Sequence, residues 1–303
     1  MAPTSSRPQA GTAHTPRRGQ PSTWTPVGPL TPHLYRPTPE RPLRAKRHVL
    51  QASSVVRPHC HDWWQLSFST HGILRMTASD MTYTLPPSRA IWIPPGLTHS
   101  VTVVEDAVLY TLYGLPADFP ARPAGAQARP ESHWHDCRVL ELTDLLRLLA
   151  LELDTTADDV LPTRHIPVDT RREALIAPLI LDELRRADSA PIGVPLPADK
   201  RLRSLCQSML VDLARHDTLE GWAAETGASA RTIHRLFRQE LGTTYVQWRQ
   251  QAVLAQALAM MARGQPLAHI AADLGYDSAS AFSAMFRKRY GESPSQFARR
   301  LAA

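Results

Sequence analysis

The sequence predicts an α+β protein in which an N-terminal β-barrel is followed by an all-α C-terminal domain with two helix-turn-helix motifs. Short runs with strand character, separated by Gly and Pro, fill residues 48–115. Helical periodicity replaces them from about residue 141 and continues to the end of the chain. Within this helical half one helix-turn-helix pattern occurs twice, about 48 residues apart. Such a repeat is typical of a protein that reads DNA at two places.

The first segment, residues 1–47, is rich in Pro, Thr, Ser and Arg and has almost no apolar periodicity. This composition predicts a disordered basic tail, either a flexible leader or an arm that adds non-specific DNA affinity. The net charge is +7 in residues 1–47, +4 in residues 215–303 and negative between them. Basic ends joined to an acidic middle favour a nucleic-acid module attached to a module of another kind.

The three cysteines, Cys60, Cys137 and Cys206, are scattered along the chain and odd in number. They indicate reduced thiols and exclude a disulfide-framed secreted domain. No apolar run approaches the length that crosses a bilayer, and the N-terminus lacks the apolar core of a signal peptide. We therefore expect a cytoplasmic protein with no membrane partner.

The second segment, residues 48–140, is expected to form the barrel. Its strand-like runs include residues 65–68, 90–93 and 101–104, and Gly72 and Pro94-Pro95-Gly96 mark corners between them. Short strands at this spacing are typical of a small barrel or sandwich.

The third segment, residues 141–198, is expected to be helical, with a linker near residues 192–197. Its leucines recur at helical spacing, and this stripe predicts either a self-association surface or a face that packs on the barrel. The stripe consists of Leu142, Leu145, Leu146, Leu149 and Leu153. A second amphipathic stretch spans about residues 171–187. We expect a homodimer held together by this segment.

The fourth segment, residues 199–303, holds the two helix-turn-helix copies. Gly227 and Gly275 occupy matching turn positions, where a left-handed backbone is needed. A connector helix over residues 244–262 would be about 28 Å long, close to the roughly 34 Å between successive major-groove faces. One rigid connector could therefore hold both reading helices against one face of DNA.

The second helix of each copy separates into an apolar stripe and a small or polar face. Phe237, Phe282, Met285 and Phe286 are expected to be core anchors. Small side chains allow a helix to sit deep in the major groove, and arginine can bind guanine or phosphate. The candidate DNA-binding residues are Ser229, Arg231, Thr232, Arg235, Arg238, Ser278, Ser280, Ser283 and Arg287.

The residues of the second copy carry a family resemblance. Residues 270–278, 282–287 and 290–294 closely resemble the signature of AraC/XylS-type transcription regulators. The resemblance covers about residues 200–300. It implies a bacterial regulator of promoter DNA, with RNA polymerase as a further candidate partner and an N-terminal module that senses a small-molecule effector, dimerises, or does both.

The barrel segment resembles the two cupin motifs. His59 and His61, followed by Gln65 and Gly72, have the spacing of the first motif, and residues 94–99, which end in His99, resemble the second. In metal cupins two histidines, a carboxylate and a third histidine converge on one ion. Here Gln65 replaces the carboxylate, which weakens a hard divalent metal site.

Three interpretations of the histidines stay open. His59, His61 and His99 could bind zinc, nickel or copper, since residues 59, 61 and 65 would share one strand face. Together with Gln65 and Trp92 they could instead line an effector pocket, or they could be structural. No cofactor is certain, and a divalent metal in the cupin pocket is the candidate. Cys60 is expected to face away from its neighbours, which argues against a sensing thiol.

Residues 89–96 and the region of Leu205-Cys206 resemble the AraC subgroup near the nitroimidazole-resistance efflux regulator. This resemblance implies control of an efflux transporter gene. No catalytic residues are assigned, and we expect no enzymatic activity. Two alternatives stay open: a cupin-type metal-dependent enzyme fused to DNA-binding helices, and a DNA-binding protein that responds to no effector. Metal content and ligand-dependent thermal shift would discriminate them.

Overall fold

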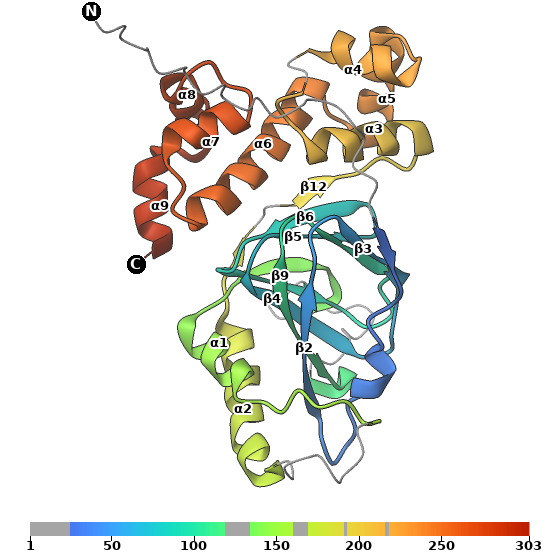
Figure 1. Cartoon of the computed structure of the whole chain (residues 1–303), viewed down its shortest axis with the longest axis vertical. Coiled ribbons are helices and arrows are strands. Elements are labelled where there is room, and N and C mark those ends of the chain that lie inside the picture. The colour runs from blue at the N-terminus through green and yellow to red at the C-terminus, as the bar shows by residue number, and fades with distance from the viewer. Residues whose placement is uncertain (1–24, 119–133, 160–168, 191–192, 216–217, 303) are drawn as a thin grey trace, which may run out of the picture.

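The computed structural model describes residues 25–118, 134–159, 169–190, 193–215 and 218–302. A two-sheet β domain lies at one end of the molecule and a helical domain at the other, with the short strand β12 between them (Figure 1). The α+β class and the order of the two halves are as predicted from the sequence.

Two six-stranded sheets form the barrel. The first sheet has the strand order β1-β3-β8-β5-β6-β12, and the second has the order β11-β10-β7-β4-β9-β2. The strands are β1 (Thr25–Val27), β2 (Leu43–Leu50), β3 (Ser54–His59), β4 (Trp64–His71), β5 (Leu74–Ala78), β6 (Met81–Leu85), β7 (Arg89–Ile93), β8 (His99–Val103), β9 (Ala107–Gly114), β10 (Arg138–Glu141), β11 (Ser189–Ala190) and β12 (Gly193–Pro195).

Helices cover the second sheet and build the C-terminal domain. They are the 3₁₀ turns η1 (Pro32–Tyr35) and η2 (Pro116–Asp118), and the α-helices α1 (Asp144–Leu151), α2 (Thr170–Arg186), α3 (Lys200–Val211), α4 (Leu219–Thr226), α5 (Ala230–Leu241), α6 (Tyr245–Ala262), α7 (Leu267–Asp273), α8 (Ala279–Tyr290) and α9 (Pro294–Ala302).

The predicted boundary of the tail at residue 47 is wrong. Strand β1 pairs in parallel with β3, and all eight residues of β2 pair with β9. Residues 25–47 therefore belong to the barrel, and the rest of the predicted tail, residues 1–24, lies outside the described residues. The sequence hid β2 because its inward-facing residues Arg44 and Lys46 are polar, which removes the apolar alternation that marks a strand.

The leucine stripe of residues 141–153 packs mainly on the barrel. Leu146 and Leu153 are buried with the outer face of the second sheet, and Leu142 and Leu149 pack partly against the same cluster. Leu145 is 52% exposed. Most leucines of the stripe are therefore not available for self-association, because they cover Trp64, Phe68 and their neighbours on that sheet.

The expected linker near residues 192–197 is a structured element over its described residues, 193–197. Strand β12 pairs with β6 of the barrel, while the side chains of Val194 and Leu196 are buried in the core of the helical domain. Trp248 of α6 donates its indole hydrogen to the carbonyl of Pro195 at 2.7 Å, and Gln251 donates to that of Gly193 at 2.7 Å. The helical core therefore begins before residue 199, the predicted boundary.

Two further contacts join the domains. Arg75 of β5 is 7% exposed and donates to the carbonyl of Leu210 at the end of α3, at 2.6 Å. Arg263, which follows α6, forms an ion pair with Glu105 of the barrel. The helical domain is thus held against the first sheet by backbone pairing, a buried guanidinium and an ion pair.

Candidate DNA-reading surface and effector site

Helices α4 and α5 form the first helix-turn-helix unit, and α7 and α8 form the second. The turns contain Gly227 (φ +65°) and Gly275 (φ +77°), both in the left-handed region as expected. Gly242 and Gly291 end α5 and α8 in the same conformation. Each reading helix therefore follows a turn that contains a glycine with a left-handed backbone, and it ends at a second glycine of the same kind.

Aromatic side chains anchor both reading helices in one core. Phe237, Phe282 and Phe286 are 0% exposed, which confirms three of the predicted anchors, and Met285 is half-buried against the same cluster. Phe237 contacts Trp248 of the connector with ring centroids 5.7 Å apart. The apolar side of each reading helix is thus used by packing, and the opposite side is left for a partner.

The exposed face of α5 is cationic. Arg231, Arg235 and Arg238 are exposed, and Arg235 donates to the side chain of Gln239 at 2.6 Å. His234 is also exposed and lies on the same face, one turn from Arg231 and Arg238. The sequence analysis did not include His234, although its helical spacing from Arg231 and Arg238 predicts that it shares their face.

The corresponding face of α8 is nearly free of long side chains until its last turn. Ser280 and Ala284 are exposed, Ser283 is half-buried and donates to the carbonyl of Ala279 at 2.7 Å, and Arg287 is exposed. A small surface of this kind allows close approach of the helix backbone to a groove.

Three of the candidate DNA-binding residues have local structural roles. The side chains of Ser229 and Ser278 are N-caps that accept from the backbone N–H groups of Thr232 and Ala281. The hydroxyl groups of Ser229 and Thr232 lie 2.9 Å apart, and Thr232 is half-buried. These side chains stabilise the starts of the reading helices, where the free N–H groups also suit a phosphate.

The connector α6 has the predicted extent, with Thr244 as its N-cap and Gln247 closing a capping box. Its 18 residues span about 27 Å at 1.5 Å per residue. Tyr245, Trp248, Ala252, Ala255 and Leu258 are all buried, as are residues on its other faces. The connector is the central helix of the domain and contacts both units.

The three histidines of the barrel meet at one place. The ring centroid of His99 lies 4.4 Å from that of His59 and 5.3 Å from that of His61. His59 and His99 are cross-strand partners of β3 and β8. His61 lies after the end of β3, and the backbone N–H of Gly96 donates to its carbonyl at 2.8 Å. The expectation that residues 59, 61 and 65 share one strand is wrong, since a turn separates β3 from β4.

Each histidine uses Nδ1 in the same way. Nδ1 lies 2.8–2.9 Å from a backbone carbonyl in all three rings, that of Arg57 for His59, Trp63 for His61 and Leu97 for His99. A carbonyl accepts only, so Nδ1 carries the proton, and Nε2 of His59 and His99 presents its lone pair in the neutral ring. Nε2 of His61 is instead hydrogen-bonded to the side-chain amide of Gln65 at 2.8 Å. In His59 and His99 this tautomer can accept a hydrogen bond from an effector or donate its lone pair to a metal.

Burial keeps His61 and His99 uncharged. The pKa of His99 is lowered to about 3, mainly by desolvation and to a lesser extent by the nearby His59 and His61. Desolvation also lowers the pKa of His61, against the raising effect of its hydrogen bond to Gln65 at 2.8 Å. Both rings are therefore neutral at pH 7.

The donor set does not match a resident metal. Gln65 supplies an amide where a carboxylate would supply charge, and it is already bonded to His61 and to Ser67 at 2.8 Å. Among the described residues, no group of three or more His, Cys, Asp or Glu side chains is arranged to hold a metal ion.

Trp92 was expected beside the histidines, but the structure places it on the opposite side of its sheet. It stacks on Trp64 and donates its indole hydrogen to the carbonyl of Trp134 at 2.9 Å, beneath α1 and α2. Trp63 instead stacks on His61, with ring centroids 5.0 Å apart and an interplanar angle of 5°. Cys60 is exposed.

Comparisons with known proteins match both halves. The model of the AraC-like ligand binding domain matches residues 50–166, and that of a helix-turn-helix domain matches residues 222–300. The chain is 31% identical over 243 residues to the HTH-type transcriptional regulator NimR of Escherichia coli K12, covering 80% of this chain and 82% of that protein. It belongs to the AraC family of transcriptional regulators.

Two further similarities concern parts of the chain. The arabinose operon regulatory protein of Salmonella typhimurium is 33% identical over 131 residues, 42% of this chain and 47% of that protein. A crystal structure of a DNA-binding transcriptional dual regulator from Escherichia coli K-12 matches with 28% identity, a TM-score of 0.31, and coverage of 34% of this chain and 91% of that chain. Within the described residues of this regulator, no helix is long and apolar enough to span a bilayer.

Proposed function

We propose that this AraC-family regulator acts as a homodimer, that each protomer contacts two successive major grooves of promoter DNA with α5 and α8, and that the barrel binds a small-molecule effector near His59, His61 and His99. The pair of reading helices carries the DNA part of the proposal. Each helix buries its aromatic side in a shared core and leaves its other side exposed. The connector between them is about 27 Å long, close to the roughly 34 Å between successive major-groove faces.

Sequencing of the DNA fragments bound by the full chain in its host tests this proposal. We expect fragments upstream of genes, each with two conserved half-elements about 10 base pairs apart, and from the subgroup resemblance an efflux transporter gene among them. Fragments without a shared sequence would contradict specific reading of DNA.

The dimer is proposed to form through α1 and α2. These helices pack on each other, and they expose Leu145, Leu148, Leu175 and Leu179, each at least 52% exposed. A cluster of large apolar side chains on paired helices is typical of an association surface.

The double variant Leu148→Glu and Leu179→Glu should sediment as a folded monomer, whereas exchange of the exposed Val246 in the other domain for Glu should leave the dimer intact. A wild-type chain that is already monomeric at micromolar concentration would contradict the proposal.

The effector part rests on the Nε2 atoms of His59 and His99 and on the aromatic ring of Trp63, which stacks on His61. His99→Ala should abolish the response to the effector while DNA binding persists. Metal analysis of the purified chain distinguishes the alternative, since a stoichiometric metal that leaves on acidification would favour a metal centre over an organic effector.

A further inference from the structure

The interior of the barrel has one apolar and one polar wall. The apolar wall belongs mainly to the first sheet and includes Val56, Leu74, Met76, Val101 and Val103. The polar wall is formed by part of the inward-facing side of β2, β9 and β4. In these strands Lys46 is opposite Thr111, and Thr111 is opposite Ser67. The next row is Arg44, Tyr113 and Gln65.

Lys46 lies in the middle of this polar wall. It is one of three lysines in the sequence and is 4% exposed. Its Nζ has no hydrogen-bond partner among the described residues and lies 5.1 Å from the centre of the Tyr35 ring. Burial lowers the pKa of Lys46 to about 8, so the ammonium form still predominates at pH 7. A buried ammonium without a hydrogen-bonding partner is costly to the folded state.

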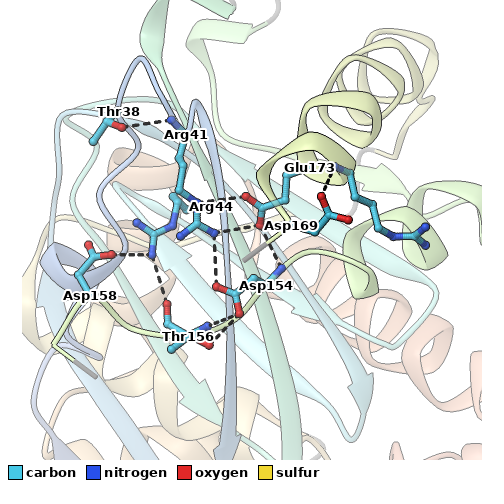
Figure 2. A network of polar contacts seen from close by, with 9 residues as sticks. Thr38, Arg41, Arg44, Asp154, Thr156, Asp158, Asp169 and Glu173 are labelled. Atoms are coloured by element: carbon cyan, nitrogen blue, oxygen red, sulfur yellow. Dashed lines mark hydrogen bonds and ion pairs between the residues drawn. The ribbon is translucent and has the colours of Figure 1, made fainter. Parts of the chain in front are cut away.

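Arg44, two residues earlier on the same strand, provides the contrast. Its guanidinium is paired with Asp158 at 2.9 Å and donates to the carbonyl of Thr156 at 3.2 Å (Figure 2). The neighbouring Arg41 is paired with Glu173 at 2.9 Å and with Asp154 at 3.4 Å. The acidic segment before α2 therefore neutralises both arginines, and within the described part of the chain it supplies no carboxylate to Lys46.

The surroundings of Lys46 offer hydrogen bonds to a ligand. The hydroxyl groups of Thr111 and Ser67 lie 3.2 Å apart, and Ser67 continues through Gln65 to His61. Nε2 of His99 is a second buried polar atom without a hydrogen-bond partner among the described residues. The barrel interior thus combines an unpaired cation, a hydroxyl pair and an apolar wall.

We infer that the effector carries a single carboxylate group that binds Lys46 and the Thr111–Ser67 hydroxyl pair, with its apolar part against the wall formed by the first sheet. This inference rests on the proposed effector site in the barrel and names the chemical class of its ligand. One unpaired lysine balances one negative charge. A phosphoryl dianion needs more cationic or N–H donors than this wall provides, because Arg44 is already paired.

Thermal shift and calorimetry of the full chain test the inference with matched acids and amides. The probes are phenylacetate, cyclohexanecarboxylate and hexanoate, each beside its primary amide. At pH 7 we expect at least one acid to raise the Tm and its amide to have little effect. Lys46→Met should weaken binding of that acid at least about tenfold, since truncating one partner of a buried charge pair removes the pair. The control Lys200→Met, at an exposed lysine, should bind like wild type.

A second readout does not depend on the choice of probe. Without ligand, Lys46→Met should raise the Tm, because methionine removes the unpaired ammonium and keeps the volume of the side chain. The inference is overturned if no acid binds, if an amide binds as tightly as its acid, or if Lys46→Met binds the acid like wild type. A lowered Tm of the ligand-free variant would also overturn it, since the contact with Tyr35 would then be the role of Lys46.

DNA binding by the same samples separates this inference from the proposed function. A Lys46→Met variant that binds promoter DNA like wild type but ignores the acid supports the inference. A wild-type chain that binds no promoter DNA contradicts the proposed function, and the acid–amide comparison then decides the ligand class independently.

Discussion

The two helix-turn-helix units share a scaffold and differ in the surface that they present. In both units a serine caps the reading helix, a glycine ends it, and a phenylalanine at the matching position, Phe237 or Phe286, is fully buried. The exposed face of α5 carries Arg231 and two further arginines, whereas α8 exposes small side chains until its basic last turn. Packing therefore constrains one side of each helix, and the other side is free to specialise.

The difference indicates two modes of DNA contact. Long cationic side chains on α5 can reach phosphates and guanine edges at a distance, and their contribution falls with salt. The small face of α8 favours close contact of the helix itself with the groove, where added bulk would be excluded. Four comparisons between variants of the two units test how far the units are alike and how far they differ.

The largest effect is expected from the buried anchors. Phe237→Ala and Phe286→Ala should each lower the free energy of unfolding by about 3–5 kcal/mol, because each leaves a cavity in the same core. Urea unfolding measures this cost. Leu236→Ala, at a half-buried position, should cost less. A difference of several kcal/mol between the two phenylalanine variants would show that the units are not equivalent in the core.

The next effect concerns operator affinity. Arg231→Ala and Arg235→Ala should each weaken binding by about 1–3 kcal/mol and reduce its salt dependence, since a cationic contact is lost. Ser280→Trp should weaken binding without changing the salt dependence, because it acts by steric exclusion. Fluorescence titration at several salt concentrations measures both. Arg299→Ala, an exposed arginine on α9, is the matched control, and equal salt slopes for all variants would contradict the division of roles.

The turn glycines should differ in tolerance. Gly227→Ala places a Cβ in open space and should cost about 1–2 kcal/mol from the left-handed backbone alone. Gly275→Ala should cost more, because its Cβ would also lie 3.2 Å from the Cα atom of Ala214. Thermal unfolding of the two variants tests this order. A Gly275 variant as stable as the Gly227 variant would show that the backbone at Ala214 moves to accommodate the added Cβ.

The smallest effect is expected at the caps. Ser229→Ala and Ser278→Ala should each lower stability by about 1 kcal/mol, because one N–H group of each reading helix loses its acceptor. Ser204→Ala, at an exposed serine inside α3, is the control. Operator affinity should change little once folding is complete. A loss of affinity that exceeds the loss of stability would assign these serines a direct DNA contact.

The helical domain was more predictable from sequence than the barrel, because its signals are local. Thr244 and Gln247, which lie within one turn of each other, mark the start of the connector. The repeated glycine turns identify both units. The barrel depends on pairing between distant segments. Nothing near Arg44 or Lys46 indicates a strand, since both face a polar interior, and the pairing of β12 with β6 is equally invisible locally.

The candidate site was predicted in part. The convergence of His59, His61 and His99 followed from motif spacing, although a turn and cross-strand pairing bring them together. Trp92 was assigned to the wrong face because the choice of face depends on which side of the sheet α1 and α2 cover. Lys46 was not predicted as a site residue. It stands out only because its buried Nζ has no hydrogen-bond partner among the described residues, which the sequence does not show.

Hydroxyl-radical footprinting of the full chain on its operator tests the central claim most directly. In each protomer, two reading helices on one rigid connector predict two protected segments on one face of the duplex, separated by about one helical turn of 10–10.5 base pairs. A homodimer therefore protects two such pairs of segments. The Arg231→Ala and Arg235→Ala double variant should lose protection in one segment of each pair and keep the other. A single protected segment per protomer, or equal loss of both segments in the double variant, would contradict two separate reading units.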